Sequence, residues 1–377
     1  MDLTKIREEI DEIDNQLIQL FAKRMETVAQ VAEYKKNNNL PIFHSGRERE
    51  ILNRISLLVK DDMSVYARML YNTLFDISRS YQSKRIYEAS AISKEIENAL
   101  NNTPKLLPCD ATVACQGTEG AYSQAATEKL FANPSVMYFN KFRGVFEAVE
   151  SGMCRYGILP VENSVHGSVT EVEDLMAEYK FSIVKSVKIQ INHVLLAKKG
   201  TKEIKEIFSH RQAIGQCERF LKSMEGVKIT PVDNTAVAAK MVAESDRDDV
   251  ASISSIQCAE LYGLQVIKSD IKDSDNNYTR FVCISKNMEI YPGADKITVM
   301  LRLSHQPGSL YNLIAKFACV GVNLTKIESR PICGLDFEFM FILDMNLSVY
   351  SNEFMSLLSE LENSSNGFTF LGAYTEI

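Results

Sequence analysis

The sequence predicts a multidomain fold with an all-helical first unit, an α/β middle unit and an α+β last unit. Apolar residues recur every three or four positions over the first 90 residues, which is typical of helices. Short apolar strands alternate with helices after residue 110, and a βαββαβ order follows residue 296. A chain of 377 residues has room for two or three such domains.

Composition and charge exclude several functional classes. Hydrophobic residues make up 45% and charged residues 24%, the balance of an ordinary globular protein, and the net charge of -7 disfavours a nucleic-acid surface. No apolar run reaches the roughly 18 residues of a membrane span. The charged N-terminus, MDLTKIREEIDEIDNQL, has no apolar signal core. The eight cysteines form no Cys-x-x-Cys pair. We therefore expect a cytoplasmic protein without a metal or a cofactor, which binds neither nucleic acid nor membrane.

Residues 1–90 form the predicted helical unit. The first helix has a coiled-coil-like seam and should end at Asn37–Asn39, because Pro41 disfavours helix in the residue before it. Two further helices are expected over Arg49–Val59 and Ser64–Ser90. The apolar seam of the first helix is too long to be buried by one chain, and it consists of Leu3, Ile6, Ile10, Ile13, Leu17 and Leu20.

Three cations on the first helix predict an anion site. Arg24 occupies a seam position that otherwise holds aliphatic residues, and a guanidinium buried without an anion is costly. Arg7 and Lys35 are 28 residues apart, which is about 42 Å along a helix. One small ligand cannot contact both on one helix, but an antiparallel second copy can place the partner's Arg7 near Arg24 and Lys35. This arrangement predicts a dimer with two symmetric sites. The alternative is that these cations are solvated or snorkel along the helix.

Residues 1–90 resemble the all-helical class of chorismate mutase, through IREEIDEID, AKRMETV, EYKK, LPIFHSGRERE and DISRSYQ. The resemblance implies an intertwined dimer in which Arg24 and the partner's Arg7 bind the substrate carboxylates. It also implies that Lys35 and Gln82 hydrogen-bond the ether oxygen. Cations and an amide suit a rearrangement that needs charge stabilisation and no nucleophile.

The same resemblance implies that Arg47, Glu48 and Ser78 complete the mutase pocket, with Glu48 towards the ring hydroxyl. Ser78 lies four residues before Gln82 and shares its helical face. His44 stands where many members carry an acid, so we expect an altered pH dependence with His44 still able to bind a hydroxyl.

Residues 91–110 lose the helical pattern and contain two prolines, which indicates a helix tail and a linker. Residues 111–290 read as α/β, with mainly parallel strands expected. Glu162, Asn163 and Ser164 directly follow a predicted strand, where ligands bind in open α/β sheets. Further candidates in this unit are Gly117 and Gly120 before a probable helix, Ser209, His210 and Gln216 in FSHRQAIGQC, and Thr279 and Arg280 at the start of a strand.

Residues 111–286 resemble prephenate dehydratase, through GTEGAYS, LPVENS, SHRQAIGQC, LYGLQV and Thr279-Arg280-Phe281. The resemblance implies two lobes, similar in outline to a periplasmic-type binding protein, with the site between them. Thr279 is then the candidate that assists hydroxide departure, as a positioned donor, since its pKa is too high for a strong acid. The implied substrate contacts are Glu162, Asn163, Ser209, Gln216 and Arg280, with Arg280 a carboxylate partner. His210 is either structural or part of the site.

Residues 296–377 resemble an ACT domain of the phenylalanine-responsive kind, through LSHQPGSLYNLIAKFACVGVNLTKIESRP. We expect a four-stranded antiparallel sheet covered by two helices, Leu310–Cys319 and Glu353–Leu361. The resemblance implies L-phenylalanine bound between paired domains, and feedback inhibition. The residues implied in this effector site are Gly308, Ser309, Leu310, Asn323, Leu324, Glu328, Ser329 and Arg330. The alternative is a scaffold domain without a ligand.

Together the resemblances imply a bifunctional enzyme of phenylalanine biosynthesis that self-associates to a dimer or tetramer. It would convert chorismate to prephenate by Claisen rearrangement, and prephenate to phenylpyruvate by decarboxylative dehydration. Two alternatives stay open: a monofunctional dehydratase whose helical unit serves dimerisation, and a non-catalytic sensor of small acids or amino acids. A prephenate dehydrogenase is disfavoured, because the sequence has no Gly-x-Gly-x-x-Gly loop for a nicotinamide cofactor.

Overall fold

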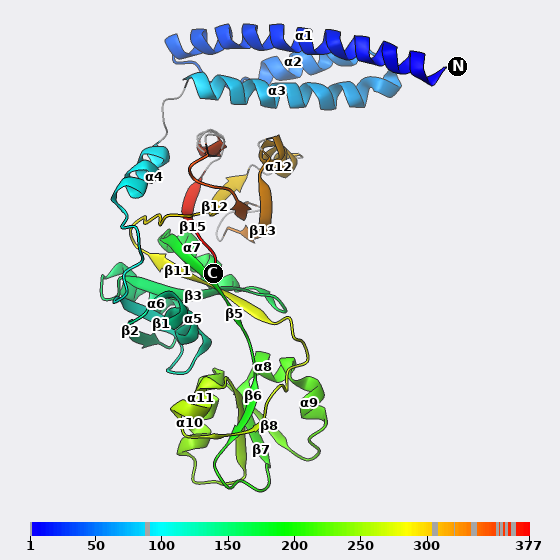
Figure 1. Cartoon of the computed structure of the whole chain (residues 1–377). Coiled ribbons are helices and arrows are strands. Elements are labelled where there is room, and N and C mark those ends of the chain that lie inside the picture. The colour runs from blue at the N-terminus through cyan, green and yellow to red at the C-terminus, as the bar shows by residue number, and fades with distance from the viewer. Residues whose placement is uncertain are drawn as a thin grey trace.

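A computed structural model gives the arrangement of the units along an elongated molecule (Figure 1). The helical unit lies at one end, followed by the C-terminal sheet, the first α/β lobe and the second α/β lobe. The structure describes residues 2–86, 91–303, 308–319, 321–332, 338–351, 354, 357–358, 361–362 and 367–377.

The helical unit consists of α1 (Leu3–Asn37), α2 (Ser45–Ser56) and α3 (Ser64–Ile86), with a 3₁₀ turn at Asp61–Met63. As predicted, α1 ends before Pro41. The start of α2 lies four residues before the expected one, because His44 caps it: His44 Nδ1 accepts a hydrogen bond from the Arg47 backbone N–H at 3.1 Å. Figure 1 shows α1 and α3 running side by side with α2 beside them.

The apolar seam of α1 is not buried by its own chain. Every residue from Asp2 to Leu20 is exposed, and Leu3, Ile10 and Leu17 expose 60%, 50% and 53% of their surface. An apolar stripe of this length is unusual on a free surface.

Residues 91–110 differ from the predicted helix tail and linker. They contain a separate helix, α4 (Ala91–Asn102), whose apolar face is buried. Ile96 and Ala99 pack into the core of the C-terminal sheet.

The first lobe is built on the strand order β2-β1-β3-β11-β5, with β4 paired to β3. Its elements are β1 (Thr112–Gln116), α5 (Tyr122–Leu130), β2 (Ser135–Phe139), α6 (Phe142–Glu150), β3 (Tyr156–Asn163), β4 (Gly167–Ser168), α7 (Thr170–Tyr179), β5 (Ser182–Gln190) and β11 (Tyr278–Ser285).

The second lobe has the strand order β10-β6-β9-β7-β8. Its elements are β6 (Val194–Ala197), β7 (Glu206–His210), α8 (Arg211–Gln216), α9 (Glu218–Lys222), β8 (Lys228–Val232), α10 (Thr235–Glu244), β9 (Val250–Ser254), α11 (Gln257–Leu261) and β10 (Gln265–Lys268).

The expected parallel strands are present in both lobes, where β1 pairs in parallel with β2 and β3, and β7 with β8 and β9, but both sheets are mixed. Strand β11 runs antiparallel to β3 and β5, and β6 runs antiparallel to β9 and β10. The reason is topological. The chain leaves the first lobe directly from β5 into β6 and returns directly along β11, so these strands are not joined by helical crossovers.

The C-terminal unit has the predicted antiparallel sheet, in the order β13-β14-β12-β15. Its elements are β12 (Lys296–Leu303), α12 (Ser309–Cys319), β13 (Asn323–Pro331), β14 (Phe339–Asn346) and β15 (Thr369–Tyr374). The second predicted helix, Glu353–Leu361, lies partly outside the described residues. Phe354, Leu357, Leu358 and Leu361 are helical and buried.

The C-terminal sheet is covered on both faces. One face packs against α4 and the helices of its own unit. Met300, Ile342, Leu371 and Tyr374 of the other face join the apolar core of the first lobe. After β15, the Ile377 backbone N–H donates to the Ser186 carbonyl of β5 at 2.9 Å, so the chain end runs along the edge of the first lobe.

Candidate functional site

The helical unit gathers a polar cluster between α1 and α3. Arg24 Nη1 donates to Ser78 Oγ at 2.5 Å, and Gln82 Nε2 donates to the Ser78 carbonyl at 3.2 Å. Ser78 and Gln82 are only 5% and 7% exposed, although both are polar. Gln82 Oε1 is buried and has no hydrogen-bond partner within the described part of the chain. An unpartnered buried amide oxygen is unusual, and it can accept a hydrogen bond from a donor group of a bound ligand.

Lys35 and Glu48 extend this cluster towards α2. Lys35 Nζ donates to the Ile42 carbonyl at 2.5 Å. Burial lowers the pKa of Lys35, while the negative charge of Glu48 opposes that shift. Both oxygens of Glu48 accept hydrogen bonds from Arg79 Nη1, at 2.5 and 2.7 Å. The sequence interpretation missed Arg79, although it directly follows Ser78 in the DISRSYQ motif.

Three predicted mutase residues lie outside the cluster in a single chain. Arg7 is exposed on the N-terminal half of α1. Arg47 forms an exposed ion pair with Glu50 at 2.7 Å. His44 uses Nδ1 to cap α2, a structural role that the sequence interpretation did not include. The structure thus joins Arg24, Ser78 and Gln82 by hydrogen bonds and places Lys35 within the electrostatic reach of Glu48.

The α/β unit places Asn163 and Thr279 opposite each other, because β3 ends where the antiparallel β11 begins. Asn163 Nδ2 lies 3.0 Å from Thr279 Oγ1 and 2.9 Å from Asn277 Oδ1. Asn163 Oδ1 accepts from the His166 backbone N–H at 3.0 Å. Both ends of the Asn163 amide are therefore fixed, and the amide holds the threonine hydroxyl in place.

A hydrogen-bonded chain continues from this pair into the second lobe. Gln216 Nε2 lies 3.2 Å from His166 Nδ1, and Gln216 Oε1 lies 2.8 Å from His193 Nε2. Burial lowers the pKa of His193. A neutral His193 must donate from Nε2 here, because the Gln216 oxygen can only accept. Gln216 therefore bridges the two lobes. His166 and His193 were missed, although His166 lies in the ENSVHGSV segment.

Ser209 and His210 have structural partners. Ser209 is fully buried, and its Oγ donates to the Ile253 carbonyl at 2.7 Å. His210 caps α8 by accepting from the Gln212 backbone N–H at 3.3 Å, and burial lowers its pKa. The expected substrate contact of Ser209 is therefore corrected: its side chain points into the sheet of the second lobe.

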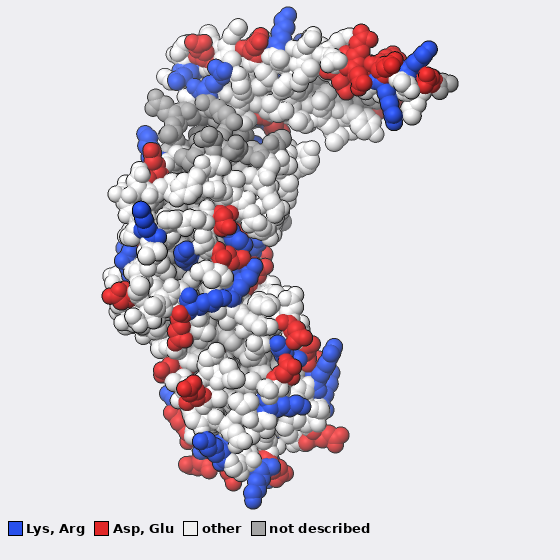
Figure 2. Space-filling model, in the orientation of Figure 1, with Lys and Arg blue, Asp and Glu red and all other residues white. Residues whose placement is uncertain are grey.

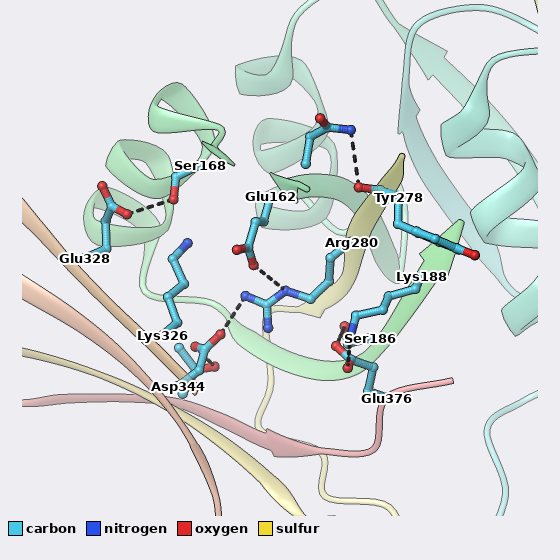
Figure 3. Close-up of polar contacts among 12 residues, drawn as sticks. Glu162, Ser168, Ser186, Lys188, Tyr278, Arg280, Lys326, Glu328, Asp344 and Glu376 are labelled. Carbon is cyan, nitrogen blue, oxygen red and sulfur yellow. Dashed lines mark hydrogen bonds and ion pairs between the residues drawn. The ribbon is translucent and has the colours of Figure 1, made fainter. Parts of the chain in front are cut away.

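Glu162 and Arg280 also need a correction. Consecutive residues of a strand point to opposite faces, so the Glu162·Arg280 pair faces away from the Asn163·Thr279 pair. Arg280 is 9% exposed, and its Nη2 binds Asp344 Oδ2 of β14 at 2.5 Å. Its Nε lies 3.4 Å from Glu162 Oε2, and Figure 3 shows Arg280 between the two acids. Both residues therefore lie at the contact with the C-terminal sheet, and neither is placed to bind substrate between the lobes.

The predicted effector residues are spread over two regions of the C-terminal unit. Glu328 Oε2 accepts from Ser168 Oγ at 2.8 Å, as Figure 3 shows, and Arg330 Nη2 contacts both Asp174 oxygens at 2.9 Å. These two residues thus contact the first lobe. Ser329 and Asn323 are exposed, and Leu324 packs against the sheet core. Gly308, Ser309 and Leu310 lie at the start of α12, where Gly308 has a positive φ of 86°.

The charge distribution is mixed. Figure 2 shows acidic and basic side chains interspersed over the visible face, with acidic groups gathered near the N-terminal end of the helical unit. The described residues contain no group of His, Cys, Asp or Glu side chains placed to share a metal ion. Within the same residues, no helix has the length and apolar character that a membrane span requires.

Comparison with known proteins matches two separate segments of the chain to two family models. The family model described as chorismate mutase type II matches residues 6–83, and the one described as prephenate dehydratase matches residues 113–289. A bifunctional chorismate mutase/prephenate dehydratase of Aquifex aeolicus is 30% identical over 376 residues, which cover 99% of this chain and 98% of that protein.

Two further similarities each cover more than two thirds of the chain. The chloroplastic arogenate dehydratase/prephenate dehydratase 2 of Arabidopsis thaliana is 33% identical over 316 residues, covering 78% of this chain and 81% of that protein. A solved prephenate dehydratase of Arthrobacter aurescens in complex with L-Phe is 30% identical, with a TM-score of 0.65, and covers 70% of this chain and 89% of that chain.

Proposed function

The chain belongs to the family of bifunctional chorismate mutase/prephenate dehydratases. We therefore propose that each of its two polar clusters catalyses one of the two reactions. The protein converts chorismate to prephenate and prephenate to phenylpyruvate. We assign the first step to residues 1–90 and the second to residues 111–290. The observation that carries this assignment is that each segment matched to a family holds its own converging polar cluster.

The mutase step uses charge stabilisation. Chorismate carries two carboxylates and develops negative charge on its ether oxygen as it rearranges. Arg24 binds a carboxylate in this proposal, and protonated Lys35 together with Gln82 stabilises the ether oxygen. The Arg79–Glu48 hydrogen bonds fix Glu48, so that it faces the ring hydroxyl and sustains the charge on Lys35.

The dehydratase step removes carbon dioxide and hydroxide from prephenate. The electrons of the breaking carbon–carboxylate bond enter the ring, and the ring hydroxyl leaves with its bonding pair, so aromatisation drives the reaction. Thr279 Oγ1 accepts a hydrogen bond from Asn163, which leaves the threonine O–H free to donate to the departing oxygen. Gln216 contributes from the second lobe, so closure of the lobes completes the site.

The mutase pocket is shared by two chains in this proposal. The exposed seam of α1 has the length and apolar character to pack against a second copy. An antiparallel copy brings the partner's Arg7 to the cluster around Arg24, and a symmetric dimer then holds two sites. The free cysteines at positions 109, 115, 154, 217, 258 and 283 support a reducing, cytoplasmic location.

We also assign L-phenylalanine as the effector of the C-terminal unit. The L-Phe complex of the Arthrobacter aurescens enzyme supports this assignment. The start of α12 lies in the predicted effector segment, and the positive end of a helix favours a bound carboxylate.

The direct test supplies purified protein with chorismate or with prephenate at neutral pH and follows both substrates and phenylpyruvate. Both substrates should yield phenylpyruvate, and L-phenylalanine should slow only the second step. A protein that converts prephenate but not chorismate would favour the alternative of a monofunctional dehydratase. A protein that converts neither substrate but binds L-phenylalanine in a calorimetric titration would favour the alternative of a non-catalytic sensor.

A further inference from the structure

Two adjacent cross-strand pairs of the β3–β11 ladder connect the dehydratase site to the C-terminal unit. Asn163 pairs with Thr279, and Glu162 pairs with Arg280. The register shifts directly after Arg280, because Val161 of β3 is skipped in the pairing, as at a β-bulge. Bulges beside active sites set the direction of nearby side chains. The position of Arg280 is therefore coupled through one peptide unit to the position of Thr279.

Arg280 is held by a buried chain of polar groups that belongs to the C-terminal sheet. Asp344 binds Arg280 with Oδ2 at 2.5 Å and accepts from Thr298 Oγ1 with Oδ1 at 2.8 Å. Thr298 Oγ1 lies 2.7 Å from the hydroxyl of Tyr374. Asp344 is 3% exposed, so water does not screen its charge. Figure 3 shows Asp344 reaching Arg280 from the sheet of the C-terminal unit.

Two other ion pairs between the C-terminal unit and the first lobe involve α7 and not β11. Lys326 Nζ binds Glu173 Oε1 at 2.6 Å, and Arg330 binds Asp174 at 2.9 Å. Glu173 and Asp174 lie on α7, so these contacts hold the units together without reaching β11. Among the ion pairs of the described residues, Arg280–Asp344 is the one that joins β11 to the C-terminal sheet.

We propose that Asp344 is a positioning residue for the dehydratase reaction, which acts through Arg280 on the hydroxyl of Thr279. This inference rests on the proposed dehydratase role of Thr279 and deepens it. A carboxylate at β14 fixes the guanidinium, the guanidinium fixes the start of β11, and β11 aims the threonine. The C-terminal unit thereby has a direct mechanical connection to the reacting group. Displacement of the C-terminal unit therefore alters kcat more than it alters KM.

The test compares three variants of the full-length protein with prephenate as substrate. Asp344→Asn should lower kcat by about 10- to 100-fold, with KM changed less than about threefold, since a small misplacement of a reacting group has this effect. The matched control is Asp174→Asn, which weakens an interdomain ion pair on α7, and its kcat should stay within about twofold of the wild-type value.

A double variant separates positioning from stability. Arg280→Met with Asp344→Leu removes both buried charges together and replaces them with apolar side chains, which proteins often tolerate. The thermal unfolding midpoint should return towards the wild-type value while kcat stays low. Recovery of kcat in this double variant would overturn the proposal, as would wild-type kcat in Asp344→Asn. If the wild-type protein itself fails to convert prephenate, the proposed function fails instead.

Discussion

Thr279 and Asn163 face each other across the antiparallel ladder of β11 and β3, with 3.0 Å between Thr279 Oγ1 and Asn163 Nδ2. Replacing Thr279 with valine keeps the shape and removes the hydroxyl, so dehydratase kcat should fall by at least about 100-fold. Thr279→Ser keeps a hydroxyl and should stay within about tenfold of the wild-type value. The mutase rate of both variants should not change, because α1–α3 lie in another unit. Near-full turnover by Thr279→Val, measured as phenylpyruvate release, would exclude this role.

Lys35 should carry much of the mutase rate. Lys35→Met removes the cation assigned to the ether oxygen, and kcat/KM for chorismate should fall by about 100- to 1,000-fold. Lys36 is the next residue of α1, is exposed, and gives a matched control. Lys36→Met should leave kcat/KM within about twofold. Equal losses in both variants would show that the general charge of α1, not the site, matters.

The pH dependence of the mutase step follows from the lowered pKa of Lys35. The proposed role needs the protonated amine, so kcat/KM should fall as the pH rises through a pKa below the usual lysine value of 10.5. Glu48 opposes the shift, so Glu48→Gln should lower the pKa further and move the fall in kcat/KM to lower pH. Lys35→Arg stays protonated and should lose the alkaline fall. If kcat/KM of Glu48→Gln fell at the same pH as that of the wild-type protein, the proposed interaction between Glu48 and Lys35 would be contradicted.

The α1 seam should decide both self-association and mutase activity. Leu17→Glu places a charge in the middle of the exposed seam and should convert the assembly to smaller species in sedimentation experiments. The mutase rate should fall with it, because the partner's Arg7 is lost, while dehydratase turnover remains. Asn15→Glu adds the same charge to the same helix at a polar position and serves as the control. A monomeric wild-type protein with full mutase activity would contradict the shared pocket.

Substitution of Ser209 should lower the stability of the protein, whereas substitution of Gln216 should lower its dehydratase activity. Ser209→Ala removes a buried hydrogen bond to the Ile253 carbonyl and should destabilise the protein by about 1 kcal/mol without changing turnover per folded molecule. Gln216→Ala breaks the contact between the lobes and should lower dehydratase kcat/KM by about tenfold. Thermal unfolding and prephenate kinetics of both variants test the distinction. Reversed effects would restore Ser209 as a site residue.

The sequence predicted the order of the three units and most of the mutase cluster. Helical periodicity places Ser78 and Gln82 on one face, and the seam position of Arg24 marks it as unusual. In the α/β unit, Asn163 and Thr279 were predicted from LPVENS and Thr279-Arg280-Phe281, the motifs of the resemblance, and the antiparallel ladder that pairs them was not predicted.

The parts of the site that the sequence did not predict depend on contacts between segments far apart in the chain. Strand alternation alone separates Thr279 from Arg280, but only the packed C-terminal sheet shows that Arg280 meets Asp344. One signal was available: Asp344 is the single charged residue within the strand segment FMFILDMN. A lone acid in an apolar strand indicates a buried partner, and the sequence does not say which cation fills that role.

The most direct test of two separate sites follows chorismate, prephenate and phenylpyruvate by NMR at neutral pH in the wild-type, Lys35→Met and Thr279→Val proteins. The account predicts that the wild-type protein carries chorismate to phenylpyruvate and that Thr279→Val stops at prephenate. Lys35→Met should leave chorismate unchanged yet still convert added prephenate. Phenylpyruvate formed at the wild-type rate by Thr279→Val, or chorismate consumed at the wild-type rate by Lys35→Met, would contradict it.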